Sequence, residues 1–302
     1  DAQESRGLGD VYKRQAFIGT LLMAIFANYP FALAPGMGLN AYFAYTVVIG
    51  MGYTWQYALT AVFAEGIIFI LLSLTNVREA IFNAIPMNLK SAVSVGIGLF
   101  IAFVGLQNAH IVVGGSTLLQ LFSVDAYNKA NGVEASFNNV GITVILALAG
   151  IIITGILVVK NIKGNILWGI LITWGLGIIC QFAGLYVPNA DLGFYSLLPD
   201  FSKGLSIPSL TPIFGKLQFK GIFSVDFIVI LFAFLFVDLF DTIGTLVGVS
   251  AKADMLDEEG KLPHIKGALL ADAVATTVGA ILGTSTTTTS VSYTHLTLPT
   301  IA

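Results

Sequence analysis

The sequence predicts an all-α polytopic membrane protein, a chain of helices that crosses the bilayer many times. Hydrophobic residues make up 56% of its 302 residues and charged residues only 10%, whereas charged residues make up about 25% of a soluble domain. Residues 16–64 contain no Asp, Glu, Lys or Arg, and apolar runs of about 20 residues, the length that spans a bilayer, recur along the chain. Because backbone in lipid must satisfy its own hydrogen bonds, these runs are expected to be helices.

The apolar runs place the expected spans in chain order. An amphipathic connector occupies residues 77–90, and polar loops occupy residues 114–139 and 188–224, the second with a short surface helix. The expected spans are 16–28, 39–49, 54–74, 91–113, 140–159, 165–187, 225–249 and 265–283.

The segment 28–40, NYPFALAPGMGLN, separates the first two spans. Pro30 is incompatible with the interior of an unkinked helix, PFALA is expected to be extended, and Pro35 suits the first turn of the helix that follows. A proline kink alone is one interpretation. Because non-helical backbone at membrane depth is tolerated where it lines a cavity, we favour a binding site with Asn40 at the start of the new helix.

The span 225–249 carries two carboxylates near its middle, Asp238 and Asp241. Three residues apart on a helix, they are expected on one face with their Cβ atoms about 5–6 Å apart. Inserting an acid at the bilayer centre costs about 2.5–3.5 kcal/mol, and such acids usually face a polar cavity or a partner. Pairing with a neighbouring helix for packing alone is the alternative, and we favour a functional role.

Four further polar residues in the spans are secondary candidates: Glu65, Gln107, His110 and Asp272. Polar groups in spans more often hydrogen-bond a neighbouring helix than line a path. The remaining charges are expected in loops, Arg78 among them on the cytoplasmic side. No cofactor or metal site is predicted, because the acidic loop 251–264 lacks the ligand spacing of a calcium loop.

Other features of the chain limit the classes of function. There is no basic patch, so no nucleic-acid partner is predicted, and the single cysteine, Cys180, provides no disulfide framework. The sequence GTSTTTT at 283–289 is a second β-prone break. Paired breaks in corresponding positions are typical of inverted-repeat transporters.

The two ends of the chain differ from the rest. Residues 1–15 are polar and join the first span without a loop, and residues 290–302 have no span, cap or charge pattern. Both resemble translated adapter sequence, so we exclude them and expect a native transporter fragment of residues 16–289. The genuine gene is expected to diverge after about Thr289, to place a glutamate near the present Ser292 and to continue for several spans.

Four motifs carry a resemblance to a known family: FANYPFALAPGMGLNAYF, GLQNAHIVV, FVDLFDTIGTLVG, and ADMLDEEGKLP with the later TSTTTT. They resemble the nucleobase:cation symporter family 2, specifically its AzgA-like branch of adenine/guanine/hypoxanthine permeases, over nearly all of residues 16–289. The resemblance implies fourteen spans in two inverted seven-span repeats, divided into a core and a gate, with half-strand, half-helix third and tenth spans. This chain would hold about spans two to nine and the start of the tenth.

The resemblance also implies roles for residues. Gly38 and Asn40 match the binding motif of the third span, and Asp238 and Asp241 match the functional acids of the eighth. The implied function is secondary-active transport of purine nucleobases across the plasma membrane by alternating access, coupled to H⁺ or Na⁺, with a homodimer left open.

The chemistry of these side chains agrees with that role. A carboxylate accepts hydrogen bonds from the N–H groups of a purine, and an Asn amide both donates and accepts. We therefore expect Asp238 to contact the base and Asn40 to fix its far edge. Two acids this close favour one shared proton, so Asp241 is expected to tune the site or to share the coupling proton.

Three alternatives remain open from the sequence. An anion transporter of the same fold would need a neutral or positive site, and two acids repel anions. An intramembrane aspartyl protease also needs two aspartates, and GLGD occurs at residues 7–10, but Asp238 and Asp241 share one helix whereas a protease dyad faces across two. A receptor that does not transport is separated from a transporter only by a flux assay.

Overall fold

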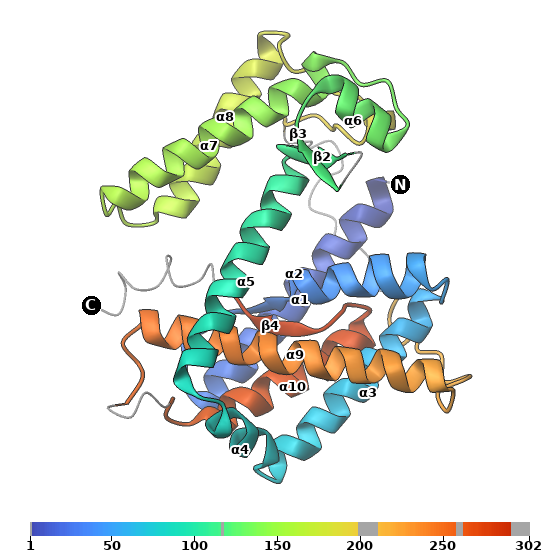
Figure 1. The fold of residues 1–302 in the computed structure, drawn as a ribbon, viewed down its shortest axis with the longest axis vertical. Coiled ribbons are helices and arrows are strands. Elements are labelled where there is room, and N and C mark those ends of the chain that lie inside the picture. The colour runs from blue at the N-terminus through green and yellow to red at the C-terminus, as the bar shows by residue number, and fades with distance from the viewer. Residues whose placement is uncertain (1, 116–117, 199–210, 258–261, 291–302) are drawn as a thin grey trace. The chain divides into compact units, whose positions relative to one another are not determined.

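The structure, a computed structural model, describes residues 2–115, 118–198, 211–257 and 262–290 (Figure 1). Most elements in these residues are helical. The helices are α1 (Ala2–Ala27), α2 (Met37–Ala41), the π-helix η1 (Tyr42–Gly50), α3 (Trp55–Leu74), α4 (Val77–Ala84), α5 (Met87–Asn108), α6 (Val124–Asn131), the π-helix η2 (Phe137–Gly141), α7 (Ile142–Val159), α8 (Asn165–Phe182), the 3₁₀-helix η3 (Ala190–Leu192), α9 (Val225–Lys252) and α10 (Ile265–Leu282). The strands are β1 (Leu33–Pro35), β2 (Val112–Gly114), β3 (Leu119–Leu121) and β4 (Thr287–Thr289).

Six helical stretches in the described residues are long and apolar enough to cross a membrane, by length and composition. They coincide with six of the expected spans, so the predicted helical membrane architecture is confirmed. The stretches are Trp55–Leu74, Asn88–Asn108, Phe137–Val159, Asn165–Phe182, Val225–Ala251 and Ile265–Leu282.

Local signals set where several of these helices begin and end. Thr54 precedes α3, and its Oγ1 accepts from the backbone N–H of Tyr57 (3.3 Å). Ser224 precedes α9 and accepts in the same way from Phe227 (3.2 Å). Such caps satisfy N–H groups that the first turn of a helix leaves without a partner. The C-terminal end of α10 has a signal as well. The helix stops before Gly283, whose φ of 96° ends the helical hydrogen bonding.

Two helices end earlier than the sequence predicts. α5 stops at Asn108 rather than at residue 113, because His110 takes a left-handed φ of 58°. The residues that follow form the antiparallel β2–β3 pair. α8 stops at Phe182 rather than at residue 187, and Gly184, with a φ of 71°, turns the chain there.

The first helix extends beyond its expected span. α1 begins at Ala2, and it ends at Ala27, one residue before the predicted end, because Asn28 takes a φ of 56°. Gln15, the last residue of the predicted leader, is buried. Its Nε2 donates to the carbonyl of Ser285 (3.1 Å) and to Thr287 Oγ1.

The predicted break after α1 is confirmed, but Pro35 lies on the strand side of it. Pro35 is the last residue of β1, Gly36 remains extended (φ −69°, ψ 122°), and α2 begins at Met37. The expectation that Pro35 opens the helix is therefore wrong. The N–H of Gly36 donates to the carbonyl of Thr286 (3.0 Å), which keeps the backbone extended for one residue more.

The two predicted breaks meet as one antiparallel pair of strands, β1 and β4. The partners are Leu33 with Thr289, Ala34 with Thr288, and Pro35 with Thr287. The backbone N–H and C=O groups on the outer edges of such a two-stranded pair need hydrogen-bond partners from the protein, because lipid provides none. Leu33 N–H donates to Thr20 Oγ1 of α1 (3.1 Å), and Thr287 N–H donates to Thr276 Oγ1 of α10 (3.1 Å). Threonine hydroxyls from neighbouring helices thus replace the missing strands.

The described residues form two compact units. The first contains residues 2–99 and 211–290, and the second contains residues 100–198 with its gap at 116–117. In the first unit α10 is largely buried and packs on α1 and α3. A Cβ added at Gly66 would lie 2.3 Å from Thr277 Oγ1, so α3 and α10 approach closely only because this residue is glycine.

The second unit contains the α7–α8 hairpin, α6 and the β2–β3 pair. Its small core includes Val113, Tyr127 and Phe194. The short helix expected within residues 188–224 corresponds in the described part to η3. The remainder of that loop at 199–210 and the predicted tail from residue 291, including Ser292, lie outside the described residues.

Candidate functional site

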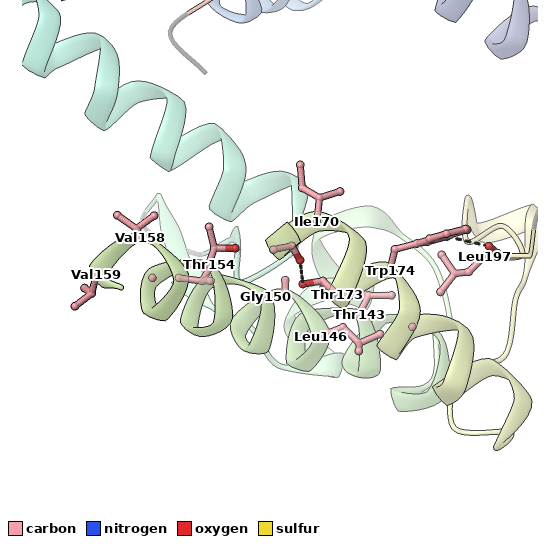
Figure 2. Close-up of a pocket in the computed structure, with 15 residues that line it drawn as sticks. Thr143, Leu146, Gly150, Thr154, Val158, Val159, Ile170, Thr173, Trp174 and Leu197 are labelled. Atoms are coloured by element: carbon pink, nitrogen blue, oxygen red, sulfur yellow. Dashed lines mark hydrogen bonds between the residues drawn. The ribbon is translucent and has the colours of Figure 1, made fainter. Parts of the chain in front are cut away.

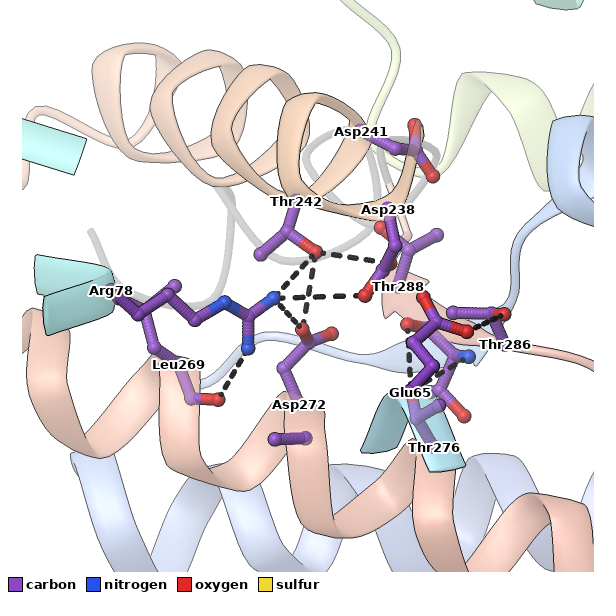
Figure 3. Close-up of polar contacts among 12 residues, drawn as sticks. Glu65, Arg78, Asp238, Asp241, Thr242, Leu269, Asp272, Thr276, Thr286 and Thr288 are labelled. Atoms are coloured by element: carbon purple, nitrogen blue, oxygen red, sulfur yellow. Dashed lines mark hydrogen bonds and ion pairs between the residues drawn. The ribbon is translucent and has the colours of Figure 1, made fainter. Parts of the chain in front are cut away.

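Four ionisable side chains from four helices meet inside the first unit (Figure 3). Glu65 comes from α3, Arg78 from α4, Asp238 from α9 and Asp272 from α10, and each is 0% exposed. We call these four residues the charged cluster. Since burying an isolated charge is strongly unfavourable, each charge must find its partners within the cluster or in the backbone around it.

Arg78 lies at the centre of the charged cluster. Its Nη2 is 2.8 Å from Asp272 Oδ2 and 3.7 Å from Asp238 Oδ2, and its Nη1 donates to the carbonyl of Leu269 (2.9 Å). Its guanidinium carbon lies 4.0 Å from the centre of the Phe69 ring, a cation–π contact. One cation therefore joins α4 to carboxylates on α9 and α10.

Thr242, one turn after Asp238 on α9, adds a hydroxyl to this group. Its Oγ1 lies 3.1 Å from Asp272 Oδ2 and 3.4 Å from Asp238 Oδ1, and it accepts from Arg78 Nη2 at 3.4 Å. A hydroxyl has one proton to donate. Thr242 can therefore serve only one of the two aspartates at a time.

Among the described residues, Glu65 is the acid of the cluster that makes no ion pair with Arg78. Its Oε2 accepts from Thr286 Oγ1 at 3.2 Å. Within the described residues, one oxygen of each acid has no hydrogen-bond partner: Glu65 Oε1, Asp238 Oδ2 and Asp272 Oδ1. Buried acceptors without a partner are uncommon in folded proteins, so these three oxygens are the ones to explain.

Asp241 contacts a different set of groups. A Cβ added at Gly36 would lie 3.3 Å from Asp241 Oδ2 and 3.3 Å from Thr288 Cγ2, so Asp241 lies beside the β1–β4 pair. Figure 3 shows Asp238 directed toward Arg78 and Asp241 directed away from it. The two aspartates thus have separate neighbours although only three residues separate them.

Asn40 and Gly38 lie on α2, directly after β1. Asn40 Oδ1 accepts from Ser285 Oγ, in the segment that leads into β4. Both Asn40 and Gly38 are half-buried. The two breaks are therefore joined by this side-chain contact as well as by the strand pairing.

The chemistry available here is that of hydrogen bonding. Carboxylates accept, the amide of Asn40 donates and accepts, and the hydroxyls of the threonine run do both. Among the described residues, no group of three His, Cys, Asp or Glu side chains is arranged to hold a metal ion.

Arg78 was expected in a cytoplasmic loop, and this expectation is wrong. Arg78 is on α4, fully buried and paired with Asp272. The amphipathic pattern of the connector gave no sign of this, because the partners lie on helices far along the chain. The available signal was the excess of acids in the spans, since buried acids need a cation nearby.

The structure does not bring Gln107 and His110 into the charged cluster. Both belong to the second unit. Gln107 is exposed, and the His110 ring packs edge-on against the rings of Tyr127 (4.9 Å between centres) and Phe194 (5.9 Å). Burial lowers the pKa of His110 below its usual 6.5, as expected for a histidine that is packed among aromatic rings.

The second unit also has an open groove of about 860 Å³ along α7 and α8 (Figure 2). Its walls are apolar or small residues, Gly150 and Thr173 among them, with no charged residue. A Cβ added at Gly150 would lie 2.7 Å from Thr173 Oγ1, which shows how closely the two helices approach. The polar side chains of its lining are three threonines and Trp174, so the groove offers no carboxylate or amide to a polar ligand and is not the candidate site.

Residues 16–294 match a family described as the Permease family. This chain belongs to the Permease family. It is 46% identical over 273 residues to a putative permease of Methanocaldococcus jannaschii, an alignment that covers 90% of this chain and 56% of the relative. It is 41% identical over 276 residues to the guanine/hypoxanthine permease PbuO of Bacillus subtilis (90% and 58%). It is 34% identical over 274 residues to the adenine permease AdeP of Escherichia coli (90% and 55%).

These findings confirm the resemblance to a nucleobase permease family. A chain of this family whose described residues include six helices long and apolar enough to cross a membrane is a multi-pass integral membrane protein, and membership of the Permease family argues against the protease alternative. The chain spans about half the length of the curated relatives it matches.

Proposed function

We propose that this chain is part of a secondary transporter that carries purine nucleobases across the plasma membrane by alternating access, with a proton as the coupling ion. The names of its relatives, guanine/hypoxanthine permease and adenine permease, support the class of substrate. The observation that carries the proposal is the paired break. Strands β1 and β4 pair beside Asn40 and Asp241 in the interior of the first unit, and broken spans at membrane depth are typical of transporter binding sites.

The proposed contacts use the groups that the base can pair with. Asp238 accepts an N–H of the base, and Asn40 donates to and accepts from its far edge. Gly38 has no side chain, so the base can approach the backbone of α2. A molecule with the wrong donors would leave these buried groups unpaired, which is the source of selectivity.

Asp241 is the proposed ion-coupling group. Uptake is then expected to rise as the external pH falls, because a proton is carried with each base. A flat pH profile together with a dependence on sodium would replace the proton by Na⁺. The resemblance also leaves a second copy of the chain as a predicted partner.

The test is purine uptake by the intact gene product in cells that lack their own purine transporters. We expect uptake of labelled hypoxanthine or adenine, and competition by unlabelled purines but not by inorganic anions. Competition by anions would favour the anion-transporter alternative. Purine binding without flux would favour a receptor, and neither binding nor flux from correctly inserted protein would contradict the proposal.

A further inference from the structure

The charged cluster contains more negative groups than its cation can neutralise. Glu65, Asp238 and Asp272 face one Arg78, and all four side chains are 0% exposed. With every group ionised, three negative charges would stand against one positive charge. Like charges held this close in a low-dielectric interior cannot all stay ionised, so at least one carboxyl must hold a proton.

The contacts indicate which carboxyl this is. Asp272 and Asp238 are the two acids within 4.0 Å of the guanidinium, at 2.8 and 3.7 Å from Nη2. Glu65 has a hydroxyl, that of Thr286, as its described donor. A neutral donor stabilises an ionised carboxylate less than a guanidinium does. Glu65 is therefore the acid for which the charged form is least supported.

The carboxyl oxygens without a hydrogen-bond partner also indicate that Glu65 holds the proton. Glu65 Oε1 and Asp238 Oδ2 are both buried without a hydrogen-bond partner, and Figure 3 shows the carboxyl groups of the two residues facing each other. Two ionised carboxylates have no proton to share, whereas a protonated carboxyl donates to an ionised one. A single proton on Glu65 would satisfy both oxygens at once.

We propose that Glu65 is a proton-holding site, in which the protonated carboxyl of Glu65 donates to Asp238 while Arg78 keeps Asp238 and Asp272 ionised. Arg78 is then a positioning residue. The groups that face Glu65 are Thr286 beside β4, Arg78 on α4, Asp238 on α9 and Asp272 on α10. The π-helix η1, which also packs on α3, carries no acidic or basic residue.

This site has a consequence for transport that rests on the proposed function. With Glu65 protonated, Asp238 stays ionised and can accept an N–H of a base. Without that proton, two negative carboxyls are in contact, and Asp238 tends to take up a proton, which makes it a weaker acceptor for the N–H of a base. Proton binding at Glu65 and purine binding at Asp238 therefore favour each other, which is the linkage that symport requires.

The direct test does not depend on transport. The chain is labelled with carbon-13 at the glutamate carboxyl carbon, placed in lipid bilayers and examined by solid-state NMR across a pH series. We expect one glutamate signal with the chemical shift of a protonated carboxyl at neutral pH, and the Glu65→Gln variant should lose it. The exposed Glu134 is the internal control, and Glu134→Gln should leave that signal in place.

A second pair of variants keeps the test decisive if Glu65→Gln fails to fold. Arg78→Lys retains the positive charge and should retain the protonated glutamate. Arg78→Gln removes the cation, so in an aspartate-labelled sample an additional protonated carboxyl should appear. If all glutamates including Glu65 are ionised at neutral pH in the folded wild-type chain, the proposal is wrong.

The transport arm separates this inference from the proposed function. In the intact gene product, purine affinity should fall above the titration point of Glu65 by up to about tenfold per pH unit, as for one linked proton. In Glu65→Gln, which mimics the protonated form, the part of the pH dependence that Glu65 contributes should be lost while purine exchange persists, and any part contributed by Asp241 should remain. A protonated Glu65 without any purine transport would contradict the proposed function and leave the proton site standing. An unchanged pH profile in Glu65→Gln would contradict the linkage.

Discussion

The guanidinium of Arg78 lies 2.8 Å from the carboxylate of Asp272, and both side chains are fully buried. The pair joins the short helix α4 to α10, which the chain reaches only after α9. Removing one partner of a buried ion pair leaves an uncompensated charge, and this typically destabilises a protein by about 3–5 kcal/mol. The pair is therefore expected to be one of the main polar links within the first unit.

The first prediction concerns this link. Arg78→Ala should lower the free energy of unfolding of the chain by about 3–5 kcal/mol, measured by denaturant titration in mixed micelles. Lys160→Ala, which removes an exposed cation, should change it by less than about 0.5 kcal/mol. Equal effects of the two substitutions would show that Arg78 is not buried with its partners.

The second prediction concerns Asp238. Asp238→Asn in the intact gene product should abolish purine uptake while leaving its amount in the membrane unchanged. A hydrogen bond to a charged group contributes about 1.5–3 kcal/mol, so the loss should be at least roughly tenfold. Asp226→Asn makes the same change at an exposed position on α9 and should retain uptake. Wild-type uptake by Asp238→Asn would remove this residue from the site.

The third prediction concerns Asn40. Asn40→Ala should weaken the apparent purine affinity roughly 2- to 10-fold, the effect of one neutral hydrogen bond, and should affect surface expression less. Ser285→Ala removes the donor to Asn40 Oδ1 but keeps the amide, so its effect on affinity should be smaller. If affinity is unchanged and only expression falls, the break at 28–40 is a structural kink.

The fourth prediction tests the close packing of α3 on α10. A Cβ at Gly66 would lie 2.3 Å from Thr277 Oγ1, whereas nothing lies within 4 Å of a Cβ at Gly96 on α5. Gly66→Ala should destabilise the chain by about 1–3 kcal/mol through overpacking. Gly96→Ala should be neutral or stabilise by up to about 1 kcal/mol, because alanine favours the helix. Thermal denaturation of both variants checks the difference.

The fifth prediction is a pH dependence in the second unit. Burial lowers the pKa of His110 below its usual 6.5, so the unfolded chain binds this proton more readily than the folded one. The stabilisation is present above about pH 6.5 and is lost as the pH falls toward the lowered pKa. The protection factors of the amides in α6, which correct for the intrinsic pH dependence of hydrogen exchange, should therefore be lower at about pH 5 than at pH 8. His110→Asn, which tolerates the left-handed backbone, should remove the difference.

The helices and the breaks could be read from the sequence because their causes are local. Apolar length defines a span, and proline, glycine and a threonine run disfavour a continuous helix whatever surrounds them. The residues 28–40 and 283–289 were therefore predicted as interruptions, and β1 and β4 lie within them. The error at Pro35 arose because the group that accepts the hydrogen bond from Gly36 N–H, the carbonyl of Thr286, lies near the far end of the chain.

Length, hydropathy and residue type are local properties, and they were enough to predict a polytopic helical membrane protein with acids in its spans. The partner of each acid became known only from the fold. Arg78 looked like a loop cation until α9 and α10 placed Asp238 and Asp272 beside it. Asp241 lies beside the β1–β4 pair, whereas Asp238, three residues earlier on the same helix, belongs to the charged cluster. Such pairings depend on contacts between elements distant in the chain, and no local pattern encodes them.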